Sequence, residues 1–508
     1  MKRRGEEKAV ADSSFWAVCL VVVPLSAAIA CFLRPSLGTP VGLVVSGLNG
    51  GAVFFLIRGL LSSGPGWYQL GGWQLPVGIS LRMDGLSVLM TAMTAVTGGA
   101  VSLYAGGYFS LRIGIARNSR RHEQRKRFFW PLWLILWAGL NGLFLSADFF
   151  NIYVTLEIVG LCAAILTALS GKSASRIAAM RYLLVGLLGS CSFLLGVALL
   201  YRSHGVLDMA TVGRLATPSP LLWAALALLT AGLMMKSALF PLHFWLPSAH
   251  ANALAPVSAI LSGLVIKASL YLLLRLWGDI FAHLLPFSAY VILGSLGGAA
   301  MIWGAAQALL QQRLKMLIAY STVAQIGSIL IALPLIHLDG DISARQAAVF
   351  LVLSHAFAKS AMFLAAGAIF LHAGHDRIED LSGIKEQLPT AAFACVVAGV
   401  SLIGLPPSAG FIGKWLLLAV AFRSGHWWWG IMLVTGSLLS GAYIYRVVCP
   451  LLTFKSPFPY KNQDVPWIME WSALFLAVLA MVMGLFAAYP LGLLEGGTPF
   501  FAGLGAAL

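Results

Sequence analysis

The stretch FFNIYVTLEIVGLCAAILTAL, residues Phe149–Leu169, decides how the rest of the chain is interpreted. It is long and apolar enough to cross a lipid bilayer, because a transmembrane helix needs about 20 predominantly apolar residues. One carboxylate, Glu157, stands in its middle. A charge at the bilayer centre costs roughly 2.5–3.5 kcal/mol, and such residues mark ion or proton pathways. The stretch therefore predicts a membrane-spanning helix with a functional carboxylate.

The composition extends this interpretation to the whole chain. Of 508 residues, 59% are hydrophobic and 10% are charged, whereas soluble domains carry about 25% charged residues. We therefore predict an all-α integral membrane protein with about 14 transmembrane helices, because each apolar run is long enough to span. The runs lie near residues 15–33, 41–61, 83–110, 129–146, 148–170, 175–201, 221–240, 254–277, 287–310, 316–335, 343–373, 391–422, 427–453 and 467–492.

The net charge of +15 does not indicate a nucleic-acid partner. The basic residues lie in loops beside the spans, where the positive-inside rule places them in cytoplasmic segments. Placing the longest hydrophilic loop, Arg112–Arg127, in the cytoplasm puts most basic loops on the same side and both termini outside. The basic segment Met1–Arg4 favours the opposite orientation of the N-terminus. Either way, the sequence predicts a multi-pass protein of the cell (inner) membrane.

Cofactor and metal motifs are not visible in the sequence. The six cysteines are scattered without CxxC spacing, so neither a zinc site nor an iron–sulfur cluster is expected. His243 and His250 flank Pro247, a poor ligand spacing. Gly171-Lys172-Ser173 resembles the end of a phosphate-binding loop, but Leu166 stands where that motif needs glycine. We expect no cofactor, no metal and no redox centre in this chain.

Prolines interrupt two apolar spans, each beside a lysine. Pro241 follows Lys236, and Pro406–Pro407 precede Lys414. Proline breaks a helix, and a broken helix at membrane depth survives where protein or water satisfies its freed carbonyls. Paired interruptions in two halves indicate inverted repeats. We expect four units: N-terminal helices over 1–128, a first five-helix repeat over 129–277, a second over 287–453, and a C-terminal helix over 454–508.

Further ionisable residues accompany Glu157 at depth, namely Lys236, Lys267, His355, Lys359 and Lys414. Intramembrane charges of this kind predict a proton relay, since buried lysines and histidines change protonation as their neighbours change. Simpler interpretations remain open for each. Glu157 with a lysine could only hold helices together, Lys236 could extend to the interface, and His355 could be a hydrogen-bonded core residue. The glycine- and tryptophan-rich segment Gly64–Arg82 predicts either a surface hairpin or an irregular loop.

Several of these residues stand in motifs that resemble a known family. The motifs are Asp148–Tyr153 (DFFNIY) leading to Glu157, His243–His250 (HFWLPSAH), Ala255–Ala259 (APVSA), Lys267–Leu272 (KASLYL), Tyr320–Gly327 (YSTVAQIG), His355–Lys359 (HAFAK) and Gly404–Pro407 (GLPP) before Lys414. Over roughly residues 84–450 the chain resembles the proton-conducting antiporter-like subunits of respiratory complex I, Mrp-type cation/proton antiporters and membrane-bound hydrogenases. It looks most like the D-type subunits of Mrp antiporters.

The resemblance implies 14 helices with two inverted five-helix repeats. It also implies that Glu157 and Lys236 form a paired site, that Lys267 and His355 form the central relay, and that Lys414 lies on the exit side. We expect a proton-translocating subunit of a hetero-oligomeric membrane complex, in antiport with Na⁺ or another monovalent cation. The alternative is a proton-pumping subunit of a complex I-like oxidoreductase or hydrogenase. A purely structural scaffold would need the buried charges to be inert.

Overall fold

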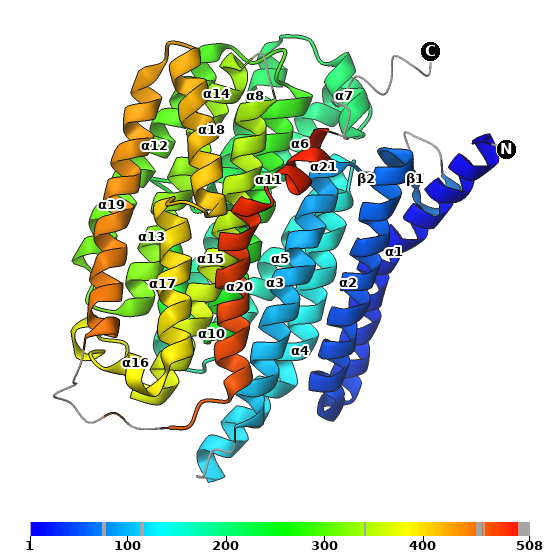
Figure 1. Cartoon of the computed structure of the whole chain (residues 1–508). Helices are drawn as coiled ribbons and strands as arrows, with labels where there is room; N and C mark the ends of the chain where they lie inside the picture. Colours follow the sequence, from blue (N-terminus) through cyan, green and yellow to red (C-terminus); the bar gives the residue numbers. More distant parts are fainter. Residues whose placement is uncertain are drawn as a thin grey trace.

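The computed structural model describes residues 2–73, 78–111, 116–339, 342–453, 460 and 463–495, with the side chains of residues 2–12 and 116–121 left aside. Within these ranges the chain is a bundle of mostly parallel and antiparallel helices (Figure 1). Twelve helices are long and apolar enough to cross a membrane, and Pro220–Lys236 and Pro389–Ile403 are shorter apolar helices. This confirms the predicted all-α membrane architecture.

The first half of the chain contains the surface hairpin and the first interrupted span. Its elements are α1 (Lys2–Leu33), α2 (Gly38–Ser63), β1 (Gly66–Gln69), β2 (Ser80–Met83), α3 (Gly85–Ser110), α4 (Ala116–Leu145), α5 (Phe149–Ala168), α6 (Ser173–His204), α7 (Met209–Leu215), α8 (Pro220–Lys236), α9 (Leu246–Asn252), α10 (Ala255–Ile260), the π-helical turn η3 (Leu261–Val265), α11 (Ile266–Arg275) and a second π-helical turn, η4 (Leu276–Ile280).

The second half contains the other interrupted span. Its elements are α12 (Phe287–Leu310), α13 (Leu314–Leu330), α14 (Ala332–Leu338), α15 (Ser343–Ala373), α16 (Ile384–Gln387), α17 (Pro389–Ile403), α18 (Ala409–Arg423), α19 (Trp427–Leu452), α20 (Trp467–Leu485) and α21 (Ala488–Glu495). Short 3₁₀ turns cover Pro35–Leu37, Leu70–Gly72 and Ile378–Asp380.

Two predicted features differ from the structure in instructive ways. The expected loop Arg112–Arg127 is helical from Ala116 onward, because α4 begins before the apolar run does. Residues 112–115 lie outside the described ranges. The single span expected near 391–422 is two helices, α17 and α18, separated at Pro406–Pro407.

The hairpin alternative for Gly64–Arg82 is correct, since β1 pairs antiparallel with β2, with Gly66 opposite Met83.

Both predicted helix breaks are present, and protein groups satisfy the freed carbonyls. At the first break, α8 ends at Lys236, and the Trp245 indole donates to the carbonyl of Met235 at 3.0 Å. At the second, the amide of Gln325 donates to the carbonyl of Leu402 at 3.0 Å. Broken helices in a membrane require such partners, so the packing of neighbouring side chains stabilises both breaks.

The two most enclosed spans are the continuous helix over Ala255–Ile280 and α15, whose apolar windows are entirely buried. They pack against each other, and α15 also packs against α13, α17, α18 and α20. The hairpin, α7, α14 and α21 gather at one end of the bundle, while α16 and the start of α4 lie at the other (Figure 1). The positive-inside rule assigns the end with the basic start of α4 to the cytoplasm.

Candidate functional site

Glu157 and Lys236 form an ion pair, as predicted. Lys236 Nζ lies 3.7 Å from Glu157 Oε2. The Lys236 side chain is 7% exposed and that of Glu157 is 22% exposed. Ser190 on α6 donates a short hydrogen bond to the same carboxylate oxygen. Lys236 does not extend to the interface, because the break after α8 leaves its side chain inside the bundle beside α5 and α6.

Lys267 and His355 are in direct contact at the centre of the bundle. Lys267 Nζ lies 2.6 Å from His355 Nδ1 and donates to the carbonyl of Ser262 at 2.7 Å. Lys267 is fully buried and His355 is 3% exposed. Two positive charges repel strongly at this distance in a low dielectric. The contact therefore favours a single positive charge on the pair. One proton lies between the two nitrogens, and only one of the two side chains is charged at a time.

Lys359 is close to this pair on the same helix as His355 but has different partners. It is fully buried, donates to the carbonyl of Ile318 at 3.2 Å and makes a short hydrogen bond to Ser321 Oγ. Both partners lie on α13. Lys359 stands in the middle of α15 and therefore does not cap a helix end. It adds a third protonatable group to the centre of the bundle.

Lys414 is held by the second helix break. Its Nζ donates to the carbonyls of Leu402 at 3.1 Å and Ile403 at 2.9 Å, the last carbonyls of α17. The C-terminal end of a helix carries partial negative charge and favours a cation. The residue is 5% exposed. No ion pair to Lys414 occurs within the described ranges, so backbone carbonyls take the place of an acidic partner.

A small cavity lies between His355 and Lys414. It measures about 10 Å³ and is lined by His355, Ser354, Ser401, Gln325 and Lys414, together with apolar side chains and Gly410. One water needs roughly 10–15 Å³ of this kind of volume and two to four polar partners. The lining supplies those partners. The cavity therefore has the size and chemistry for about one water bridging His355 and Lys414.

These groups lie across the bundle at similar depth. Glu157, Lys267 and His355 stand near the middle of their helices, and Lys236 and Lys414 stand at the two breaks. The helices that carry them also pack in order, since α8 contacts α11, the Ala255–Ile280 helix contacts α15, and α15 contacts α18. No direct contact between Lys236 and Lys267 is present in the described part of the chain.

His250 lies beside α15, the helix that carries His355 and Lys359, although its sequence motif indicated no role for it. It is fully buried, stacks on Phe363 of α15 with ring centroids 4.7 Å apart, and neither ring nitrogen has a hydrogen-bond partner among the described side chains and backbone. An unpartnered buried imidazole is costly. His250 is therefore a further candidate relay group. His243 instead stacks on Phe240, with ring centroids 5.5 Å apart.

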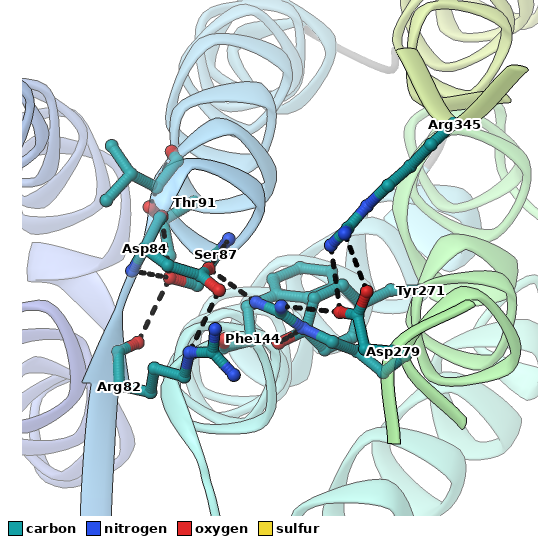
Figure 2. Close-up of polar contacts among 10 residues, drawn as sticks. Arg82, Asp84, Ser87, Thr91, Phe144, Tyr271, Asp279 and Arg345 are labelled. Atoms are coloured by element: carbon teal, nitrogen blue, oxygen red, sulfur yellow. Dashed lines mark hydrogen bonds and ion pairs between the residues drawn. The ribbon is translucent and has the colours of Figure 1, made fainter. Parts of the chain in front are cut away.

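Sequence reasoning missed a second set of charges, all buried except the partly exposed Arg345, which we call the outer charge cluster: Arg82, Asp84, Arg275, Asp279 and Arg345 (Figure 2). Asp84 pairs with Arg82 at 3.0 Å and with Arg275 through a short contact. Arg275 pairs with Asp279 at 3.0 Å, and Asp279 pairs with Arg345 at 2.7 Å. The cluster connects β2 and α3 to η4 and to the start of α15 at the hairpin end.

The outer charge cluster is suited to holding helices, not to carrying protons. Arginine stays protonated in proteins. Burial alone would raise the pKa of Asp84, but Arg275 and Arg82 hold it well below the usual range. Arg275 lies two turns, roughly 12 Å, beyond Lys267 on the same helix. Its guanidinium also donates to Tyr271 Oη at 3.1 Å, and Tyr271 donates to the carbonyl of Phe144 at 2.8 Å. The cluster therefore lies at the hairpin end of the bundle, beyond Lys267.

Arg275→Met is expected to destabilise the protein strongly. Removing one partner of a buried ion pair typically costs about 3–5 kcal/mol, because the remaining charges lose their compensation. The midpoint of thermal unfolding of the purified protein in detergent measures the effect. Arg377→Met is the matched control, since it is the same exchange at a side chain that is 60% exposed, where solvent screens the charge. Equal midpoints for Arg275→Met and the unmodified protein would contradict a stabilising role.

Comparisons with known proteins identify the family of this chain. A family profile described as NADH:quinone oxidoreductase/Mrp antiporter, TM, matches residues 146–440. These residues include Glu157, the central relay groups and Lys414.

Among individual proteins, the chain is 37% identical to the N-type subunit of the NADH-quinone oxidoreductase of Desulforudis audaxviator, over 85% of both chains. It is 30% identical to the D-type subunit of the Na⁺/H⁺ antiporter of Alkalihalophilus pseudofirmus, over 71% of this chain and 70% of that one. Among solved structures, a chain of the Mrp complex from Dietzia sp. superimposes with a TM-score of 0.84 and 25% identity, covering 96% of both chains.

Proposed function

The chain belongs to the NADH:quinone oxidoreductase/Mrp antiporter transmembrane family, and we propose from this premise that it is a proton-translocating subunit of a multi-subunit membrane complex. The observation that carries the proposal is the series of buried titratable groups at one depth, with Lys267 and His355 in contact 2.6 Å apart. Intramembrane ionisable residues that face one another are typical of proton pathways.

The contacts support the following individual roles in this proposal. The Glu157–Lys236 pair switches between paired and separated states, which changes the field at the next group. Lys267 and His355 exchange one proton through their hydrogen bond. His355 passes charge toward Lys414 through the small cavity, and Lys359 and His250 adjust the potential at the centre. The division into repeats 129–277 and 287–453 belongs to this proposal, supported by one interrupted span in each.

The finer proposal is antiport of protons against Na⁺ or another monovalent cation. It is supported by the relative named as an Na⁺/H⁺ antiporter component and by the likeness to a chain of the Mrp complex. The second candidate is a proton-pumping subunit in the membrane arm of a redox complex. The relative named as an NADH-quinone oxidoreductase component supports it. In either case this chain supplies the proton path and other subunits supply the driving reaction.

Purification of the intact complex from native membranes tests both versions. Partner subunits are identified by mass, and the complex is reconstituted in liposomes containing a pH-sensitive dye. For the antiport version we expect small membrane subunits as partners and a Na⁺-dependent proton flux. Partners with flavin or iron–sulfur centres, and flux that requires a reductant, would replace it with the redox version. A chain that purifies alone and conducts nothing would overturn the proposal as a whole.

A further inference from the structure

A pocket of about 280 Å³ opens at the cytoplasmic end of the bundle. It lies between the start of α4, the α5–α6 loop, the α9–α10 link, the start of α13 and the end of α15. We call it the basic pocket, because its charged lining residues are Arg125, Lys172, Arg313, Lys315 and Asp376. Four cations thus share one carboxylate.

That carboxylate is already used. The single Nε–H of Arg313 is shared between the two carboxylate oxygens of Asp376, with Nε to oxygen distances of 3.0 and 3.2 Å. The other three cations have no carboxylate within ion-pair distance in the described parts of the chain. Arg125 donates to the carbonyl of Ser170 at 2.6 Å, and Lys315 donates to the carbonyl of Ala253 at 3.0 Å. The basic pocket therefore carries three positive charges in excess of its one carboxylate.

Two buried polar groups in the basic pocket have hydrogen-bonding capacity that the described part of the chain does not use. Lys315 is only 7% exposed, and its hydrogen bond to Ala253 leaves most of its donor capacity free, since an ammonium has three donors. Ser170 is 5% exposed, and its hydroxyl has no partner among the described groups. The positive-inside rule explains basic residues in cytoplasmic loops. It does not explain why a buried lysine and two further cations converge on one cavity.

We propose that the basic pocket binds a phosphate group. Arginine presents a planar fork of donors that matches phosphate oxygens, and lysine adds compact positive charge. The volume of about 280 Å³ far exceeds the roughly 10–15 Å³ of the same kind of volume that one water needs, so it is ample for one phosphate group. Two sources offer this chemistry at the cytoplasmic surface, namely inorganic phosphate and the headgroup of an anionic phospholipid. A bound phosphate supplies the missing counter-charge to Lys315, Lys172 and Arg125.

The test measures binding to the intact purified complex, independently of transport. In one arm, inorganic phosphate is titrated by calorimetry at constant ionic strength. In the other, the complex is placed in nanodiscs of phosphatidylglycerol or of phosphatidylcholine, and retained lipid is measured by native mass spectrometry. Arg125→Gln and Lys172→Gln, which remove partly or fully exposed residues and leave buried Lys315 in place, are each expected to weaken binding about tenfold.

Lys126→Gln is the matched control, because Lys126 neighbours Arg125 on α4 but does not line the basic pocket. Loss of calorimetric binding in both variants, with the control unchanged, supports a free phosphate ligand. Loss of retained phosphatidylglycerol in both variants supports a lipid headgroup. Absence of binding in both arms overturns the proposal, and so does binding that is equal in the two variants and the control. Transport by the complex is not part of this readout, so the proposed function stands or falls separately.

Discussion

Lys267→Arg is expected to stop proton transport, although it preserves the positive charge. The lysine ammonium shares a hydrogen bond with His355 Nδ1, and transfer along that bond requires that lysine release its proton. Arginine does not release its proton within the range of pH a protein tolerates. Dye-monitored flux in liposomes should therefore fall to background for Lys267→Arg, and Lys267→Gln should match it.

The matched control is Lys126→Arg, the same exchange at the cytoplasmic end of α4, for which we expect normal flux. Lys172, a plain loop lysine by sequence, is unsuitable because it lines the basic pocket. Since Lys267 is fully buried, assembly of the variant complex must be verified by size-exclusion chromatography. Normal transport by an assembled Lys267→Arg complex would make Lys267 a fixed charge and remove it from the relay.

Neutralising Glu157 is expected to have an effect of similar size. Glu157→Gln or Glu157→Ala leaves Lys236 buried without its ion-pair partner, and the switching of charge at the start of the relay is lost. We expect flux at background level, with most of the protein still present in the membrane, because the Glu157 side chain is partly exposed and a glutamine still accepts from Ser190. Glu123→Gln, an exposed carboxylate on α4, is the control.

A double variant separates a relay role from a structural one. Glu157→Gln combined with Lys236→Met removes both charges, and replacing a buried ion pair by neutral groups is often neutral or stabilising. We expect the double variant to regain the thermal stability that Glu157→Gln loses, yet to remain inactive. Recovery of transport together with stability would mean that the pair only holds α5 and α8 together.

The sequence predicts those features that a short stretch of residues determines by itself. Apolar runs locate the spans, Pro241 and Pro406–Pro407 locate the breaks, and a charge in the middle of a run, such as Glu157, is conspicuous because it is costly there. Its partner Lys236 was also identifiable, since a carboxylate at depth requires a cation nearby. The relay residues themselves stay a prediction until transport is measured.

The outer charge cluster and the basic pocket could not be predicted in this way. Asp84 and Arg275 stand at the ends of spans, where a charge ordinarily reaches water and is unremarkable. Their contact joins positions 191 residues apart, and only the packing of α3 against the neighbouring span brings them together. Lys172 likewise precedes α6 and Lys315 stands in the first turn of α13, far away in the sequence. Each taken alone resembles an ordinary cytoplasmic basic residue.

The similar depth of Glu157, Lys267, His355 and Lys414 has a consequence for membrane voltage. An elementary charge that crosses the whole membrane gains or loses about 2.3 kcal/mol for every 100 mV of membrane potential. A proton that moves sideways from α8 toward α18 at one depth crosses almost none of that field. The voltage therefore acts on the vertical steps alone, uptake from one surface and release to the other, while the lateral steps proceed at equal rates in energised and resting membranes.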